Sequence, residues 1–161
     1  MKPYFSVVIS VYNKAHFVAQ TLQSILDQDF QDFEIIIVDD GSKDNSLEIL
    51  RNFTDNRISI FPTENQGVSA ARNFGLLKAN ANYIALSDGD DIWLSNHLAE
   101  LKSLIESFPN CGIYATSYQK MFFDSYTTQP KFTNLSLPFF GIVDDYFSTT
   151  IIDNILWTSA V

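Results

Sequence analysis

Acidic residues gather at two points where an apolar run of the sequence ends. Asp39-Asp40-Gly41-Ser42 follows the run 33–38, and Ser87-Asp88-Gly89-Asp90-Asp91 follows the run 83–86. A carboxylate at the first point is suited to accept hydrogen bonds from a nucleobase N–H or from ribose hydroxyls. The crowded carboxylates at the second point repel one another, and Mg²⁺ or Mn²⁺ would offset their charge. Both segments also fit a plainer interpretation, an acidic turn that is solvated or caps a helix.

A third segment combines small residues with one cation. Residues 65–75, Asn-Gln-Gly-Val-Ser-Ala-Ala-Arg-Asn-Phe-Gly, are expected to open a helix whose first N–H groups can face phosphate or ribose. Arg72 supplies a positive charge in an acidic neighbourhood. Close helix packing and an Arg72 ion pair with an Asp would account for the same residues without a ligand, and both interpretations stay open.

The elements that would position these residues alternate along the chain. Apolar, β-branched runs predict strands, and apolar residues at spacings of three and four predict helices. The expected strands cover 5–11, 33–38, 58–61, 83–86 and 113–117. The expected helices cover 15–28, a segment opened by a capping box at Asn45-Ser46-Leu47-Glu48, 68–77, and 95–108 with Ser95 as N-cap. This alternation favours a mostly parallel sheet that binds ligands beyond its carboxyl edge.

Composition limits the classes of protein that fit. The 161 residues suit one ordered domain over 1–161, and a net charge of −9 with scattered Lys and Arg argues against nucleic-acid binding. The N-terminus lacks a signal-peptide pattern and no apolar run could cross a bilayer, which favours a cytoplasmic protein, with any membrane contact peripheral at the inner face. We expect His16 and His97 at the surface, Cys111 buried without a disulfide, and Trp93 packed beneath the acidic loop.

Together the three segments, in this order and spacing, resemble the family-2 glycosyltransferases of the GT-A fold. The resemblance covers residues 6 to about 98, including the opening Val7-Val8-Ile9-Ser10-Val11-Tyr12-Asn13. It implies an α/β fold, a Rossmann-like three-layer αβα sandwich with a mostly parallel sheet. It also implies an inverting transfer of a sugar from a nucleotide diphosphate donor, usually a UDP-sugar, to a saccharide or lipid-linked acceptor, as in cell-surface polysaccharide assembly.

The resemblance also suggests roles for the matching residues. Asp40 would recognise the uracil, Tyr12 would flank the base, and Arg72 would contact the nucleotide. Asp88 would lie near the ribose or donor sugar, and Asp90 with Asp88 would hold Mg²⁺ or Mn²⁺. Asp91 would be an accessory ligand or a helix cap. The metal would stabilise the leaving diphosphate as the glycosidic bond breaks.

The family's general base is expected after a strand that residues 155–161 resemble. Asp144, Asp145 and Asp153 do not match its motif, so we expect the base beyond Val161 and regard the chain as truncated before the acceptor region. The chain by itself is then expected to bind donor better than it transfers sugar.

Three other functions stay open. A donor-binding fragment without turnover would show the same segments. A sugar-phosphate nucleotidyltransferase would need a glycine-rich basic loop where this chain has Tyr12-Asn13-Lys14-Ala15-His16. A phosphoacceptor receiver domain would need a Lys after its last strand, and no predicted strand ends in one convincingly. The sequence leaves the sugar, the acceptor, the preferred metal and the oligomeric state undetermined.

Overall fold

The fold is given by a computed structural model that describes residues 2–121, 127–128 and 141–142. Contacts within the chain group it into two compact units, residues 1–99 and residues 100–161. The prediction of one domain over 1–161 is not tested by this grouping and stays a prediction. No helix among the described residues is both long and apolar enough to cross a membrane.

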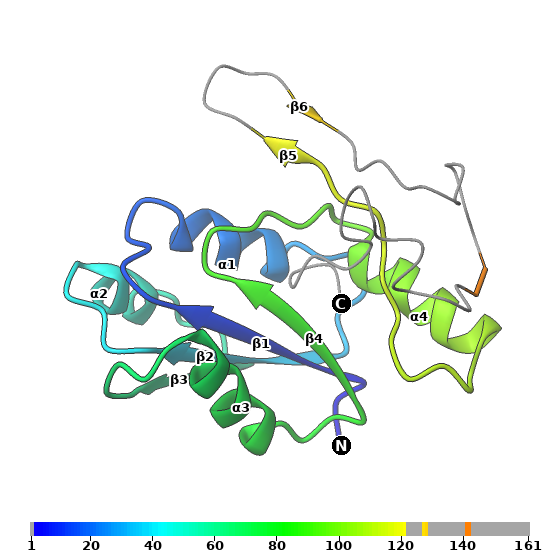
Figure 1. The fold of residues 1–161 in the computed structure, drawn as a ribbon, viewed down its shortest axis with the longest axis horizontal. Coiled ribbons are helices and arrows are strands. Elements are labelled where there is room, and N and C mark those ends of the chain that lie inside the picture. The colour runs from blue at the N-terminus through cyan, green and yellow to red at the C-terminus, as the bar shows by residue number, and fades with distance from the viewer. Residues whose placement is uncertain (1, 122–126, 129–140, 143–161) are drawn as a thin grey trace. The chain divides into compact units, whose positions relative to one another are not determined.

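The first unit is built on a parallel sheet of four strands. These are β1 (Phe5–Val11), β2 (Phe33–Asp39), β3 (Ile58–Pro62) and β4 (Tyr83–Asp88), in the spatial order β3-β2-β1-β4 (Figure 1). Every residue of β1 is buried, because both faces of a parallel sheet are covered. The register sets Val11 beside Asp39 and Ser10 beside Asp88, so the three strands end along one edge. The four predicted strands agree with these bounds to within two residues.

Helices lie on both faces of this sheet. The chain passes from β1 through α1 (Val18–Leu26) to β2, and from β2 through α2 (Ser46–Arg51) to β3. From β3 it turns back, and α3 (Val68–Lys78) crosses β2 and β1 before the chain enters β4. Right-handed crossovers in opposite directions place their helices on opposite faces. The predicted three-layer α/β fold with a parallel sheet is therefore confirmed.

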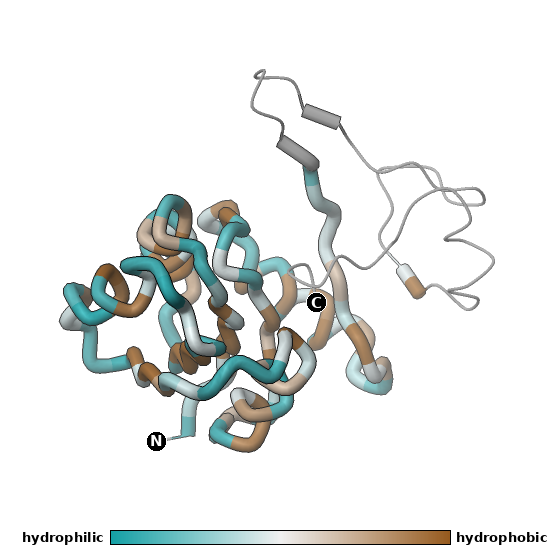
Figure 2. The backbone as a smooth tube through the Cα atoms, turned by 60° about the vertical axis from the view of Figure 1, so that its left-hand side comes forward, coloured by the Kyte–Doolittle hydropathy of each residue, from teal (hydrophilic) through white to brown (hydrophobic). Residues whose placement is uncertain are grey.

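The core on the α3 face depends on a close approach between helix and sheet. Val8, Ile36, Val38 and Ala71 form one buried cluster. Gly75 lies over β1, where a methyl group in place of its hydrogen would overlap the side chain of Val8. Apolar segments gather inside this unit and its outer loops are largely polar (Figure 2).

Three sequence predictions about elements were wrong. Residues 113–117 are not assigned to a strand, and Ile113 is 59% exposed. Only Ile113 and Thr116 in this segment are β-branched, so its strand propensity is modest. The last long helix, α4 (His97–Ser107), begins after Ser95, whose hydroxyl donates to Asp29 Oδ2 at 3.2 Å instead of capping. Asn45 makes no side-chain capping bond.

The second unit contains the remainder of α4 and a short hairpin. β5 (Lys120–Met121) pairs antiparallel with β6 (Thr127–Thr128). The strand that residues 155–161 resemble, and Asp144, Asp145 and Asp153, lie outside the described residues.

Candidate functional site

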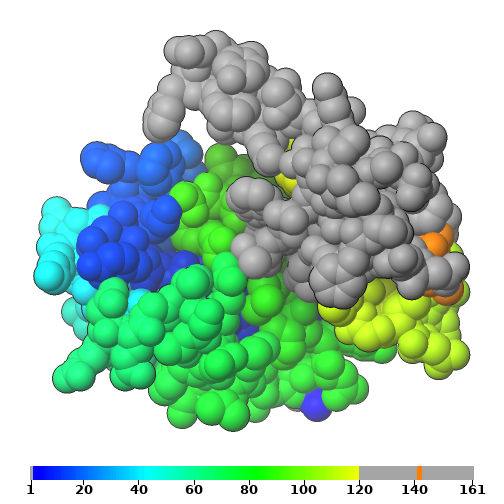
Figure 3. All heavy atoms as spheres, viewed as in Figure 1, coloured from blue at the N-terminus to red at the C-terminus, as the bar shows by residue number. Residues whose placement is uncertain are grey.

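A cleft opens at the carboxyl edge of the sheet in the first unit. Its volume is about 550 Å³, and its described walls come from the ends of β1, β2 and β4 and from the start of α3. The described lining residues are Ser10, Val11, Tyr12, Lys14, Asp40, Asn65, Gly67, Val68, Ala71, Arg72, Asp88, Gly89 and Asp90. In the space-filling view the segment after β1 (blue) adjoins the green segments that contain α3 and the end of β4 (Figure 3).

Asp40 is the buried carboxylate of this cleft. Its Oδ1 accepts the backbone N–H of Gln66 at 2.9 Å and its Oδ2 accepts that of Gly67, also at 2.9 Å. These bonds satisfy N–H groups at the start of α3, which have no partner within the helix. Each carboxylate oxygen can still accept a second hydrogen bond. Asp40 therefore has a structural role and retains the capacity to bind a ligand donor.

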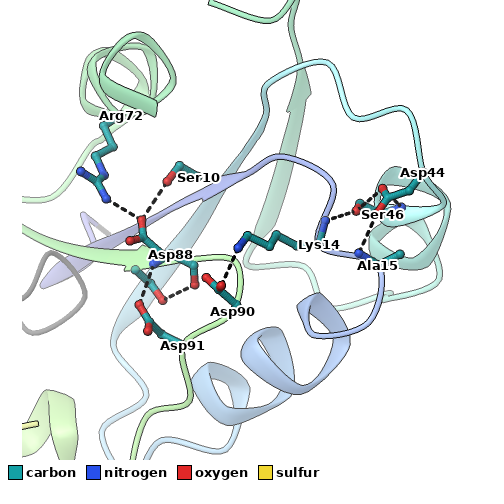
Figure 4. A network of polar contacts seen from close by, with 10 residues as sticks. Ser10, Lys14, Ala15, Asp44, Ser46, Arg72, Asp88, Asp90 and Asp91 are labelled. Carbon is teal, nitrogen blue, oxygen red and sulfur yellow. Dashed lines mark hydrogen bonds and ion pairs between the residues drawn. The ribbon is translucent and has the colours of Figure 1, made fainter. Parts of the chain in front are cut away.

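Asp88 is held by two partners from neighbouring elements. Arg72 of α3 forms an ion pair with its Oδ1 at 2.5 Å, and the hydroxyl of Ser10 donates to the same oxygen at 3.1 Å (Figure 4). The ion pair is one of the two interpretations that the sequence left open for Arg72. Because Arg72 also lines the cleft, a nucleotide contact remains compatible with it.

Asp90 is paired with a lysine that the sequence did not single out. Lys14 Nζ lies 2.5 Å from Asp90 Oδ2 (Figure 4). Gly89 makes this approach possible: its N–H donates to Ser10 O at 3.0 Å, and a Cβ there would lie 3.3 Å from Lys14 Cγ. The turn after β4 therefore lies directly against the segment after β1.

The loop that carries Lys14 is fixed to the loop after β2. Asn13 adopts a left-handed backbone with φ of 53°, which Asn tolerates better than most residues, and its Oδ1 accepts Lys43 N–H at 2.7 Å. Ser46 Oγ accepts Lys14 N–H at 2.8 Å. Asp44 accepts Ala15 N–H at 3.0 Å; burial opposes its ionisation, but hydrogen bonds, the largest from Ser46, lower the pKa of Asp44 overall.

The structure brings together five of the six residues to which the sequence gave binding or metal roles. Asp40, Arg72, Asp88 and Asp90 line the cleft, and Tyr12 lies beside them with 42% of its surface exposed. Their roles toward a ligand stay predictions. The sequence analysis did not single out Lys14 and treated Ser10 only as part of a motif, although Ser10 lies near the end of β1 and Lys14 lies in the loop that follows it.

Asp39 and Asp91 lie outside the described lining. Asp39 alternates with Asp40 along the strand, so its side chain faces the other side of the sheet, where its Oδ1 is buried without a hydrogen-bond partner. Asp91 Oδ2 accepts the backbone N–H of Asp88 at 3.3 Å and so closes the acidic turn. It caps no helix, since α4 begins six residues later.

Three expectations for other side chains are now decided. Trp93 is packed at 7% exposure, as predicted. His97 was predicted at the surface and is buried at 9% exposure, because α4 begins there and turns its ring against that of Trp93, with centroids 4.4 Å apart. Cys111 was predicted buried and is partly exposed, because the segment 111–119 lies outside any helix or strand.

The donor atoms of the cleft suit a hard divalent cation. Among the described residues no group of three Asp, Glu, His or Cys side chains could hold a metal. Mg²⁺ is commonly held by one or two carboxylates, with phosphate oxygens and water completing its shell. Asp88 and Asp90, on either side of Gly89, supply two carboxylates, and each is paired with a cation of the chain in this structure.

The chain is similar to known glycosyltransferases. The model of the family described as glycosyl transferase family 2 matches residues 6–155. Bacillus subtilis TuaG, whose name assigns it provisionally to teichuronic acid biosynthesis, is 36% identical over 94% of this chain and 60% of TuaG. An uncharacterized glycosyltransferase of Haemophilus influenzae is 42% identical over 60% of this chain and 40% of that protein. The chain thus corresponds to part of each relative.

Solved structures share the fold. TarS 1–349 from S. aureus superposes with a TM-score of 0.57 and 28% identity, over 68% of this chain and 33% of that one. The mannosyltransferase PcManGT from Pyrobaculum calidifontis, solved with GDP-Man and Mn²⁺, gives a TM-score of 0.58 at 24% identity, over 65% of this chain and 33% of that one. These neighbours confirm the expectation of a GT-A, Rossmann-like fold.

Proposed function

This chain belongs to glycosyl transferase family 2, and we propose that its cleft binds a nucleotide diphosphate sugar, a UDP-sugar, together with Mg²⁺ or Mn²⁺. The sugar is transferred with inversion to a hydroxyl of a saccharide or lipid-linked acceptor. The name of TuaG supports a role in cell-surface polysaccharide synthesis, and the TarS structure in complex with UDP-GlcNAc supports a UDP-sugar donor.

One observation carries the proposal: a single cleft gathers Tyr12, Asp40, Arg72, Asp88 and Asp90 from four different parts of the chain. The cleft lies beyond the carboxyl ends of parallel strands, where open α/β sheets bind ligands. At its rim the exposed ring of Tyr12 offers a face for a planar base. The oxygens of Asp40 lie deeper and can accept a base N–H.

Bound phosphates would meet a mixed set of charges. Arg72 is the guanidinium next to the start of α3, and Asp88 and Asp90 are the carboxylates that would hold the cation. When bound, the metal supplies Lewis-acid stabilisation of the diphosphate that leaves. The chain's own residues orient the nucleotide and place the carboxylates beside its phosphates.

Thermal unfolding tests this proposal directly. We expect UDP with Mn²⁺, at about a hundredfold above its dissociation constant, to stabilise the chain by roughly 2.7 kcal/mol, a rise in Tm of roughly 5 to 10 °C. GDP should give a smaller rise. Asp90→Asn should remove the metal-dependent part of the rise, and Tyr12→Ala should reduce the nucleotide-dependent part.

Asp32→Asn is the matched control, because Asp32 is an exposed carboxylate away from the described cleft lining. Asp40 is a poor first probe, since its loss would also leave two N–H groups at the start of α3 without partners. The absence of a Tm rise with any nucleotide, with or without metal, would contradict the proposal.

A further inference from the structure

The Lys14–Asp90 ion pair places an ammonium group on a carboxylate that the proposed function assigns to a divalent cation. The two groups are 2.5 Å apart, with side-chain exposures of 34% for Lys14 and 39% for Asp90. Ion pairs this exposed are often incidental. Here the lysine backbone is fixed by Ser46 and its stem lies against Gly89, so the side chain is directed into the cleft.

The second carboxylate of the cleft is paired in the same way. Arg72 holds Asp88, so each carboxylate proposed for the metal already has a cationic partner from the chain. The two cations differ, however. Arg72 comes from a helix and shares Asp88 Oδ1 with the hydroxyl of Ser10, whereas Lys14 comes from a loop and its ammonium group contacts Asp90 Oδ2.

We propose that Lys14 is a built-in counterion that a divalent cation must displace from Asp90, and that this competition makes metal binding depend on the nucleotide. The inference rests on the proposed function. A divalent cation that binds alone must break the ion pair and leave an ammonium group close to it, and the two positive charges repel each other. A diphosphate supplies anionic oxygens for both cations, so it removes most of this cost.

The competition predicts the direction in which the Mn²⁺ affinity changes when Lys14 is replaced. Without nucleotide, Lys14 weakens Mn²⁺ binding, so Lys14→Met should bind Mn²⁺ about fivefold more tightly than the unaltered chain, the upper range for an exposed ion pair. With UDP, the released ammonium contributes to phosphate binding. The factor by which UDP strengthens Mn²⁺ binding should therefore fall at least fivefold in Lys14→Met, and by reciprocity so should the factor by which Mn²⁺ strengthens UDP binding.

Electron paramagnetic resonance of free Mn²⁺, titrated into the whole chain with and without UDP, measures the Mn²⁺ affinity in each state without any activity assay. The ratio of the two affinities is the factor by which UDP strengthens Mn²⁺ binding, and by reciprocity also the factor by which Mn²⁺ strengthens UDP binding. Lys14→Arg retains the charge and should behave like the unaltered chain. Lys102→Met is the matched control, because it removes a lysine from an ion pair with Glu106 outside the described cleft lining. It should leave both factors unchanged.

The outcomes separate the two proposals. If Lys14→Met binds Mn²⁺ as weakly as the unaltered chain, or more weakly, while UDP still promotes Mn²⁺ binding, the counterion role is wrong and the donor site stands. If neither the unaltered chain nor any variant binds Mn²⁺ with or without UDP, the metal part of the proposed function is wrong and the counterion role is lost with it.

Discussion

At the scale of single residues, Asp40 contributes both to the start of α3 and to the wall of the cleft. The motif suggested either a ligand contact or a turn with a helix cap. The structure gives it bonds to two N–H groups at the start of α3 and also a place in the cleft wall. The two interpretations are compatible, because a carboxylate has more acceptor sites than these bonds use.

His97 provides a prediction about pH. Burial lowers the pKa of His97 to about 4, against 6.5 in an unfolded chain. The unfolded chain therefore binds the proton more readily, so the stability that depends on neutral His97 is complete above pH 6.5 and is lost as pH falls towards 4. For a group this buried the loss is on the order of 3 kcal/mol.

Urea unfolding between pH 6.5 and pH 5, above the range where most carboxylates titrate, measures this loss. The free energy of unfolding should fall less steeply with acid in His97→Gln than in the unaltered chain. His16→Gln, which removes an exposed histidine, should retain the original slope. Parallel slopes for all three proteins would show that His97 does not titrate as its burial requires.

At the scale of elements, the contact between α3 and β1 gives a prediction about packing. Gly75→Ala improves the helix propensity by up to about 1 kcal/mol, but its methyl group overlaps Val8 in the middle of β1. Overpacking of a core typically costs 1–3 kcal/mol. We expect a net loss of about 1 to 2 kcal/mol in the free energy of unfolding.

Asn73→Ala is the control for this substitution, because Asn73 is an exposed position of the same helix. It should stabilise the chain by about 0.5 kcal/mol from propensity alone. Urea unfolding of the two variants separates the effects. Stabilisation by Gly75→Ala would mean that α3 can move away from β1 without loss.

The same scale explains which elements could be predicted. Continuous apolar runs marked all four strands to within two residues, although only β1 and β2 are buried along nearly their whole length and β3 and β4 are partly exposed. The ends of helices depend on tertiary partners: Ser95 bonds to Asp29, so α4 starts later than its apparent N-cap. The segment 113–117 is not assigned to a strand, and its sequence signal was weak because only Ile113 and Thr116 in it are β-branched.

At the scale of the whole molecule, the candidate site was predictable because parallel strands end at a common edge. Residues that follow β1, β2 and β4 had to meet there, and they do. The sequence left an ion pair of Arg72 with an Asp open, but the pairing of Lys14 with Asp90 was not predictable, because it depends on how the loop of Lys14 is fixed to the segment after β2. A net charge of −9 gave no indication that both carboxylates flanking Gly89 are paired with cations.

The position of the cleft along the chain yields a last prediction. All described lining residues lie between Ser10 and Asp90, and the four-stranded sheet lies within residues 1–99. A fragment of residues 1–108, which retains α4 whole, should therefore bind UDP with Mn²⁺ within about threefold of the affinity of the 161-residue chain, a difference below about 1 kcal/mol. Isothermal titration calorimetry measures both affinities, and far-UV circular dichroism checks that the fragment is folded. A folded fragment that binds UDP more than tenfold more weakly would show that residues 109–161 contribute to donor binding, and the site would then extend beyond the described cleft.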